Sequence, residues 1–558
     1  MKSRTLSSNL TVLKKDITRF APSWILYTVG LLVTLIICQD QTSHINRTVS
    51  ALAATSWGMA IVNFCYALLN VQLLFGDLFQ SRMANALHAL PLRRENWFAV
   101  HTVSGLLFAL MPNLVMALGM SMFCMTLPAV PWLWLLWTMG TYVFFFGLAL
   151  LCAMGVGSRF ALVVVYSILN FASLLAAWLY DTVYLPMLYG LTMDFDAFLK
   201  FSPVSYGTVN IPFFTNFPNY NDYQLELTTR PEIFGYLGIL TVLGVVFGAL
   251  ALVMYRKRHL ESAGDFISAP WLKPVFLVLY TVAMGIVFQW VLGLFTGTEW
   301  LYLFIGLTVG FFTGQMLLMR TTRIFVKETF IGAGMILAVT AVTLVLTALD
   351  PLGVTRWVPK AEEVAKVEVY NPASLEATEG EDLERLLAFH QAVLDNRDEE
   401  STVKYMYATT ITYTMKDGRT AERYYVFPNL GTAYKVIEPM LHRPEVILGD
   451  LYGNWETMRG SVEISDSQGN ELRWLGTSTW ESFIEAVEKD CSEGNLIQND
   501  ELHADVARHY ALHFRWRVPE STGVLYDSVH IQIYPESTHV REWLRQQYWY
   551  KAATMEVG

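Results

Sequence analysis

Residues 76–96 read GDLFQSRMANALHALPLRREN, a polar and basic segment that separates two apolar runs, 55–75 and 97–126. A short amphipathic helix is predicted here, because apolar side chains recur at helical spacing. These side chains are Phe79, Met83, Ala86 and Leu87. Pro91 ends the helix before the basic cluster at Arg93 and Arg94. A helix of this kind between two membrane spans is expected to contact something outside the membrane.

The rest of the N-terminal half is strongly apolar. Crossing a bilayer takes about 20 apolar residues, and nine such runs have no Asp, Glu, Lys or Arg in their cores. They lie near residues 22–38, 56–75, 98–126, 132–156, 160–180, 233–255, 274–295, 300–319 and 330–349. The sequence therefore predicts an α-helical polytopic membrane domain with about nine transmembrane helices.

The charge balance changes sharply near residue 350. The chain from Asp350 to the end has 35 acidic and 20 basic residues, whereas the first 349 residues have 14 acidic and 19 basic ones. Such a shift indicates a change of solvent from lipid to water. We expect residues 350–558 to form a separate α+β domain. That domain contains only one cysteine, Cys491, and therefore no internal disulfide.

The distribution of Lys and Arg predicts the orientation. With a cytoplasmic N-terminus, the inner segments hold 16 of the 19 basic residues before position 350, and the outer loops hold Arg47, Lys200 and Arg230. This asymmetry follows the positive-inside rule. The prediction is a multi-pass protein of the cell membrane whose C-terminal domain is extracellular.

Residues 1–21 are predicted to form an amphipathic helix at the membrane interface. Its apolar face is Leu10, Leu13, Ile17 and Phe20, and its basic face is Lys14, Lys15 and Arg19. A disordered basic tail is the alternative.

Four asparagines lie within the predicted spans: Asn63, Asn70, Asn113 and Asn170. Amides in lipid seek hydrogen-bond partners on other helices, so one reading is helix association. The other reading is that they line a translocation path. Ionisable groups usually mark ion-coupled carriers, and their absence from the span cores indicates another source of energy.

The predicted outer loop 181–232 is rich in aromatic residues. Tyr184–Leu191 is expected to be an interfacial or re-entrant piece, since aromatic side chains favour the membrane interface. The alternative is an outer gate, for which the candidates are Tyr184, Tyr189, Phe213 and Phe214.

The C-terminal part alternates strand and helix patterns. A strand at 364–370, a helix at 381–394, a hairpin around 416–418 and a helix at 432–441 are followed by a similar series. Two βαββα repeats are predicted, at about 360–445 and 460–550. His390 is expected to be a core or capping histidine, and His509 and His513 lie on a strand where they do not converge on a metal. No catalytic constellation emerges.

Three features resemble bacterial type-2 ABC exporter permeases: the basic amphipathic start, the inner loop ALHALPLRREN and the exit of the sixth span, YRKRHLESAGD (255–265). The resemblance covers residues 1 to about 265. It implies a six-span permease unit at 22–265. Residues 266–349 are expected to add three transmembrane helices to this unit, and residues 350–558 to add an extracellular domain.

The resemblance also implies that 76–97 is a coupling helix that docks on a cytoplasmic ABC ATPase. The residues expected to act there are Arg82, Met83, Leu87, Leu90, Pro91, Arg93, Arg94 and Glu95. For Arg93 and Arg94, simple anchoring at the inner surface is the alternative. A second permease subunit, identical or related, completes the transporter.

No G-x-x-x-x-G-K-[ST] phosphate loop occurs in the sequence, which lacks even a Gly-Lys pair. The chain itself is therefore not expected to be an enzyme or to carry a cofactor. ATP and Mg are expected to be bound by the partner ATPase. Nucleic acid is not an expected partner. The alternative function is a membrane receptor whose extracellular domain binds a peptide or cell-wall ligand and signals without transport. Substrate and direction of transport stay open.

Overall fold

The computed structural model divides into two compact units. The helical unit comprises Met1–Tyr184 and Asp194–Val345, and the α+β unit comprises Leu185–Met193 and Leu346–Gly558. The structure describes residues 2–40, 47–80, 82–83, 93–123, 129–209, 231–258, 264–295, 299–371, 373–396, 407–427, 431–449, 452, 463–466, 471–474, 477–496, 510–517, 526–534 and 536–546.

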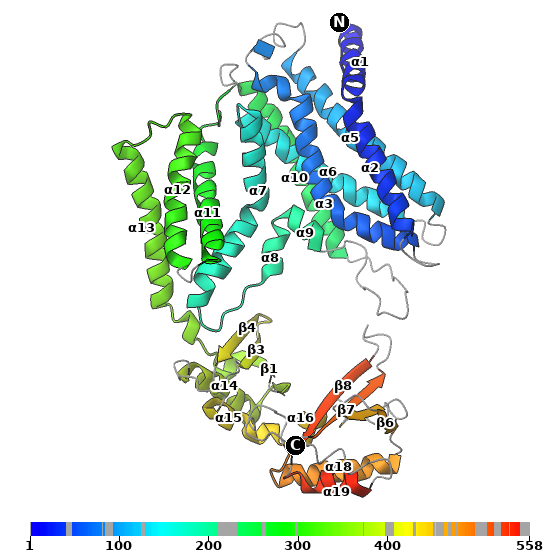
Figure 1. The fold of residues 1–558 in the computed structure, drawn as a ribbon, viewed down its shortest axis with the longest axis vertical. Helices are drawn as coiled ribbons and strands as arrows, with labels where there is room; N and C mark the ends of the chain where they lie inside the picture. Colours follow the sequence, from blue (N-terminus) through cyan, green and yellow to red (C-terminus); the bar gives the residue numbers. More distant parts are fainter. Residues whose placement is uncertain are drawn as a thin grey trace. The chain divides into compact units, whose positions relative to one another are not determined.

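The helical unit has long helices that coincide with the nine predicted apolar runs (Figure 1). They are α1 (Lys2–Arg19), α2 (Ala21–Asp40), α3 (Arg47–Leu74), α5 (Arg94–Phe123), α6 (Val130–Gly155), α7 (Arg159–Leu179), α10 (Pro231–Lys257), α11 (Leu272–Gly293), α12 (Glu299–Met319) and α13 (Lys327–Leu349), with the short α8 (Phe195–Lys200) and α9 (Pro203–Val209) between α7 and α10.

Seven of the described helices are long and apolar enough to cross a bilayer. An eighth is α2, which bends by 57° from α1 and qualifies only together with it. The apolar part of α3, Gly58–Leu74, is shorter than the others. Nine spans therefore stay a prediction.

Apolar side chains cover the outer surface of several helices. On α10, Val242 and Val245 are each 62% exposed, and on α13 Val339 is 63% exposed. Soluble proteins rarely expose contiguous apolar patches of this kind. The surface is compatible with a transmembrane protein.

The helical core is built around close contact between α6 and α10. A Cβ atom on Gly147 of α6 would overlap the backbone of Gly244 on α10, and one on Gly244 would overlap the backbone of Val143. Small residues at such a crossing let the two helix backbones touch, which increases van der Waals contact. Both glycines are therefore required by the packing.

The α+β unit contains two four-stranded antiparallel sheets with the same strand order, β2-β1-β3-β4 and β6-β5-β7-β8. The first half has β1 (Val364–Tyr370), β2 (Leu375–Ala377), α14 (Gly380–Asp395), β3 (Tyr407–Met415), β4 (Thr420–Phe427) and α15 (Gly431–Leu441). After α16 (Pro444–Leu448), the second half has β5 (Glu463–Asp466), β6 (Glu471–Trp474), α18 (Thr477–Ser492), β7 (Tyr510–Arg517), β8 (Tyr526–Ile533) and α19 (Thr538–Gln546).

This order differs from the βαββα pattern that was predicted, because a second strand precedes each helix. The extra strands, β2 and β6, have three and four residues. Such lengths are too short to produce a recognisable alternation of polar and apolar residues. The hairpin between β3 and β4 was predicted correctly, with Thr414 opposite Thr420 and Gly418 at a φ of 85°.

Candidate functional site

The predicted coupling segment begins inside the helical core. After α3 the chain forms a 3₁₀ turn, η1 (Gly76–Phe79), in which Leu78 and Phe79 are buried. Gln80 is extended, with φ −118° and ψ 114°. Phe79 is thus a core residue, and the extended backbone at Gln80 interrupts the amphipathic helix that the spacing predicted from Phe79 onwards.

The far flank of this segment is also anchored, because Trp97 and Phe98 at the start of α5 are buried. Between the flanks, Arg82, Met83 and Arg93 are exposed. Three further predicted coupling residues, Leu87, Leu90 and Pro91, lie outside the described residues. The described part of the segment is therefore an exposed stretch with two buried ends.

Arg94 and Glu95 contact the exit of α10. The Arg94 guanidinium donates to the carbonyl oxygen of Arg258 at 3.5 Å, and Glu95 lies 3.1 Å from Arg256 in an ion pair that is about half exposed. Arg258 in turn donates to the carbonyl oxygens of Ala153 (2.6 Å) and Val156 (2.9 Å). These carbonyls are unpaired at a helix C-terminus, so Arg258 caps α6.

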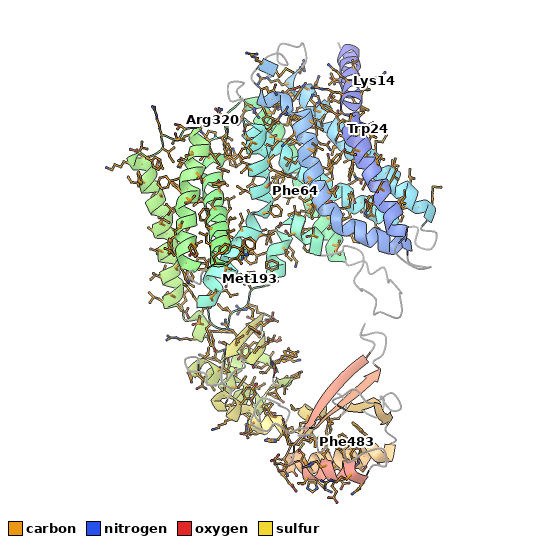
Figure 2. All side chains as sticks on the ribbon, in the orientation of Figure 1. Lys14, Trp24, Phe64, Met193, Arg320 and Phe483 are labelled. Atoms are coloured by element: carbon orange, nitrogen blue, oxygen red, sulfur yellow. The ribbon has the colours of Figure 1, made fainter. Side chains whose placement is uncertain are left out.

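The linker after α10 continues along the turn between α6 and α7. Val156 and Ile267 form an antiparallel bridge, and the amide of Gly264 donates to the carbonyl of Gly157 at 2.7 Å. The predicted inner segments between α3 and α5, between α6 and α7 and after α10 thus meet at one end of the helical unit. Lys14 of α1 and Arg320 after α12 lie at the same end (Figure 2).

Helix α1 is held there by a buried carboxylate that sequence reasoning missed. Asp16 is 5% exposed, its Oδ2 lies 2.6 Å from His101 Nδ1, and it accepts a hydrogen bond from Ser104 Oγ at 2.8 Å. Asp16 falls three residues after Leu13 and four before Phe20, within the predicted apolar face. A carboxylate on an apolar helix face needs a hydrogen-bond or ionic partner when that face is buried. This position of Asp16 was therefore the signal in the sequence.

The four amides are buried, with exposures of 2% or less. Two of them donate hydrogen bonds to another helix: Asn63 Nδ2 to Thr138 O and Thr141 Oγ1 (both 2.9 Å), and Asn70 Nδ2 to Tyr142 OH (2.8 Å).

Asn113 and Asn170 donate within their own helices, to Ala109 O and Tyr166 O. Asn113 Oδ1 also accepts from Tyr27 OH of α2 at 3.1 Å. These contacts are the ones expected if the asparagines stabilise the association of helices. A translocation path lined by the asparagines stays a prediction.

The candidate outer-gate residues are separated. Tyr184 OH lies 2.8 Å from Thr343 Oγ1 of α13. Tyr189 belongs to the α+β unit, where its ring centroid is 5.1 Å from that of Tyr425. Phe213 and Phe214 lie outside the described residues.

The segment Leu185–Met193 pairs with the edge strand of the first sheet, and the interfacial or re-entrant position expected for Tyr184–Leu191 stays a prediction. Leu191 forms an antiparallel bridge with Arg423 of β4, and the Tyr424 amide donates to the Gly190 carbonyl at 3.1 Å. Gly190 has a φ of 78°, and a Cβ there would overlap the Tyr425 ring. A backbone ladder and a ring contact therefore fasten this loop, which we name the strap (185–193), to β4.

Beneath the strap, His390 joins α14 to the sheet. Its Nδ1 is 2.7 Å from Tyr413 OH and its Nε2 2.5 Å from Tyr425 OH. Burial, with a smaller contribution from the charge of Arg423, lowers the pKa of His390 to about 3. The ring is therefore neutral at pH 7, with one nitrogen donating and one accepting. The expectation of a core histidine is confirmed.

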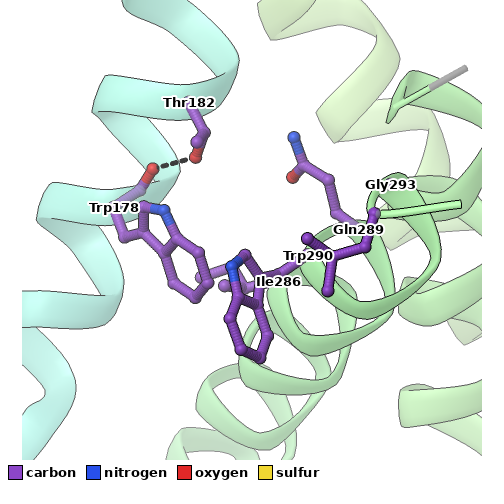
Figure 3. Close-up of a pocket in the computed structure, with 7 residues that line it drawn as sticks. Trp178, Thr182, Ile286, Gln289, Trp290 and Gly293 are labelled. Atoms are coloured by element: carbon purple, nitrogen blue, oxygen red, sulfur yellow. Dashed lines mark hydrogen bonds between the residues drawn. The ribbon is translucent and has the colours of Figure 1, made fainter. Parts of the chain in front are cut away.

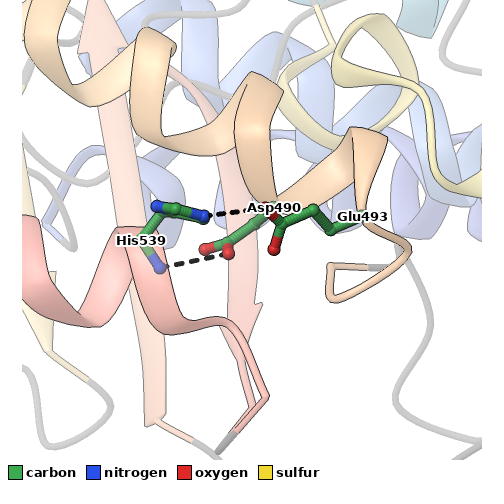
Figure 4. A group of neighbouring side chains, drawn as sticks. All are labelled: Asp490, Glu493 and His539. Carbon is green, nitrogen blue, oxygen red and sulfur yellow. Dashed lines mark hydrogen bonds and ion pairs between the residues drawn. The ribbon is translucent and has the colours of Figure 1, made fainter.

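A group of three potential metal ligands lies in the second half of the α+β unit (Figure 4). The carboxylate of Asp490 accepts hydrogen bonds from the backbone amides of His539 (3.1 Å) and Val540 (2.8 Å) at the start of α19. Glu493 pairs with His539 at 3.1 Å. Asp490 thus satisfies amides that have no partner at a helix N-terminus, and a helix cap accounts for the group.

Comparisons with protein-family models, curated proteins and solved structures found no match to this chain.

Proposed function

We propose that this protein is the membrane-spanning permease subunit of an ATP-driven ABC transporter of the exporter class. A separate cytoplasmic ATPase supplies the energy and docks on residues 76–97. A second permease subunit, identical or related, forms the other half. In this proposal the α+β unit is extracellular, and Lys14, Arg82, Arg93 and Arg320 face the cytoplasm.

The observation that carries the proposal is the anchoring of both ends of the coupling segment. Buried side chains on either flank, Phe79 and Trp97, lie in one hydrophobic core. Between them Met83 is 41% exposed, and Arg82 and Arg93 are also exposed. A push on an exposed segment with buried ends is transmitted to α3 and α5 because packed cores resist deformation.

The interaction itself should rest mainly on apolar contact. An exposed ion pair contributes only about 0–1 kcal/mol, whereas burying a methionine side chain contributes about 1.5–3 kcal/mol. Met83 is therefore expected to matter more than Arg82. Arg94 and Glu95 contact the α10 exit and would keep the segment in position.

The test is co-expression of the chain with an ATPase that carries a G-x-x-x-x-G-K-[ST] motif and is encoded beside it. We expect the two to co-purify, and we expect Met83→Glu to reduce the retained ATPase at least tenfold because it places a charge in an apolar contact. Arg323→Glu, at an exposed position after α12, is the matched control and should retain the ATPase. Unchanged binding by Met83→Glu would refute the coupling role.

A second candidate function, a membrane receptor, is favoured by the strap. Because residues 185–193 interrupt the helical unit yet belong to the α+β unit, a ligand that shifts β4 would pull on the chain next to α7. Ligand binding to the α+β unit without any change in ATP turnover would favour a receptor, and stimulated turnover would favour transport.

A further inference from the structure

A cavity of about 280 Å³ lies between the end of α7 and helix α11 (Figure 3). Its described lining consists of Trp178, Thr182, Ile286, Gln289, Trp290, Gly293 and Leu294. The two indole rings meet edge to face, with centroids 6.3 Å apart. The volume falls just below the range of about 300–1,000 Å³ for small-molecule sites, so only part of a larger molecule fits.

One polar side chain points into this space. Gln289 is 7% exposed, and its amide is directed from α11 towards α7 and Thr182. Within the described residues the amide makes no hydrogen bond to another side chain or backbone group. The amide atoms are not among the fully buried side-chain atoms that lack a partner, so they stay accessible from the cavity, and a ligand with a complementary group can form hydrogen bonds to them.

The opposite wall is a π-helical turn, η2 (Tyr180–Tyr184), that continues α7. The Thr182 hydroxyl donates to the carbonyl of Trp178 in α7, so it can only accept a further hydrogen bond. Turns of this type are rare and frequently occur at functional sites. The widened turn and the unpaired amide thus face each other across the cavity.

The lining selects the ligand chemistry. None of the seven lining residues is charged, so an ionic head group would lose its hydration without a counter-charge. An amide both donates and accepts hydrogen bonds, as do a hydroxyl or an ester beside a hydroxyl. The indole rings and Ile286 suit a hydrocarbon chain.

We propose that this cavity binds the uncharged head and upper chain of a monoacyl lipid, with Gln289 hydrogen-bonded to its hydroxyl or ester group. The rim favours a ligand that arrives from lipid, because Trp290 is 57% and Leu294 68% exposed. The inference rests on the proposed membrane location and is independent of any ATPase.

The experiment uses the full chain in phosphatidylcholine nanodiscs with a photoactivatable monoacylglycerol that carries a diazirine in its acyl chain. Mass spectrometry of the labelled peptides is expected to locate the label on α7 and α11. Gln289→Leu should lower this labelling about fivefold, the effect of losing one hydrogen bond. Gln315→Leu on α12, the same substitution at a half-buried position outside the cavity, should leave it unchanged.

Two further measurements decide the chemistry. A probe with the same chain and a phosphate head should label the cavity weakly, and equal labelling by both probes would overturn the proposal. With the unaltered chain, unlabelled monoacylglycerol should compete whereas an alkane of equal length should not. Equal competition by the two compounds would show that Gln289 makes no hydrogen bond to the ligand. This result would stand even if the Gln289→Leu variant fails to fold. A failed ATPase co-purification would leave these results unaffected.

Discussion

The helical unit and the α+β unit join their elements in different ways. In the helical unit, side chains reach from one helix to another, as Asn63 does to Thr138 and Asp16 to His101. In the α+β unit, the strap is joined to β4 through backbone atoms, with the Tyr424 amide bonded to Gly190. The reason is that a helix uses its own backbone groups internally, whereas an edge strand leaves its groups free for another segment.

The kind of contact, rather than the unit in which it occurs, determines which substitutions are tolerated, since Gly147 and Gly244 of the helical unit also form a close backbone contact. A side-chain bond between helices can be replaced by an apolar side chain of similar size, since the helices keep their internal hydrogen bonds. A backbone join has no such substitute. It depends on a close approach that a single added carbon prevents, and Gly190 is the position where the approach is tightest in the strap.

The largest effect is therefore expected for Gly190→Ala. The new Cβ would overlap the Tyr425 ring at a backbone φ of 78°, and overpacking together with a strained φ should cost about 3 kcal/mol. Hydrogen exchange at the β4 amides of the full chain measures the loss. Gly353→Ala is the matched control, because Gly353 has a φ of 65° and open space around it. Equal losses in the two variants would show that the ring contact contributes nothing.

A smaller effect is expected from acidification of the α+β unit. His390 has a pKa of about 3 in the folded protein and 6.5 as its ordinary value, so the unfolded state binds more protons between these values. Its contribution to stability is complete above pH 6.5 and falls by about 1.4 kcal/mol per pH unit below it. Lowering the pH to 5 should thus cost about 2 kcal/mol.

The measurement is the opening free energy of α14 from hydrogen exchange, corrected for intrinsic rates, in the unaltered chain and in His390→Gln. The difference between the two proteins isolates the histidine from the carboxylates. The opening free energy of α14 in the His390→Gln variant should therefore fall less steeply as the pH is lowered, because the variant lacks the contribution of His390. Parallel pH profiles would contradict a neutral, buried His390 that binds no proton when folded.

The smallest effect is expected for Asn63→Leu in the helical unit. Asn63 Nδ2 bonds Thr138 O and Thr141 Oγ1, but its Oδ1 has no hydrogen-bond partner in the described part of the chain. Thr141 still donates to Trp137 O. Removing an amide that is only half satisfied should change the unfolding free energy by about 1 kcal/mol or less.

Thermal unfolding in detergent, compared with Asn63→Ala, tests this expectation. The alanine should be worse than the leucine because it leaves a cavity. A leucine variant as unstable as Gly190→Ala would remove the distinction between side-chain contacts and close backbone contacts.

The amino-acid sequence determined the features that depend on local period and composition. Long helices coincide with the nine predicted apolar runs, the hairpin at 416–418 forms, and the predicted helix at 381–394 forms as α14 with His390 buried. These features follow from side chains three or four residues apart on a helix and from turn chemistry. They need no knowledge of distant partners.

Only the tertiary structure decided which distant groups meet. Asp16 contacts His101, Arg258 caps α6, Glu95 pairs with Arg256, and residues 185–193 pair with strand β4, which lies more than 200 residues further along the chain. Each contact depends on how whole elements pack, and the same carboxylate or loop has several possible partners in the sequence. The spacing of apolar residues determines which face of a helix is buried. Tertiary packing determines which group that face contacts.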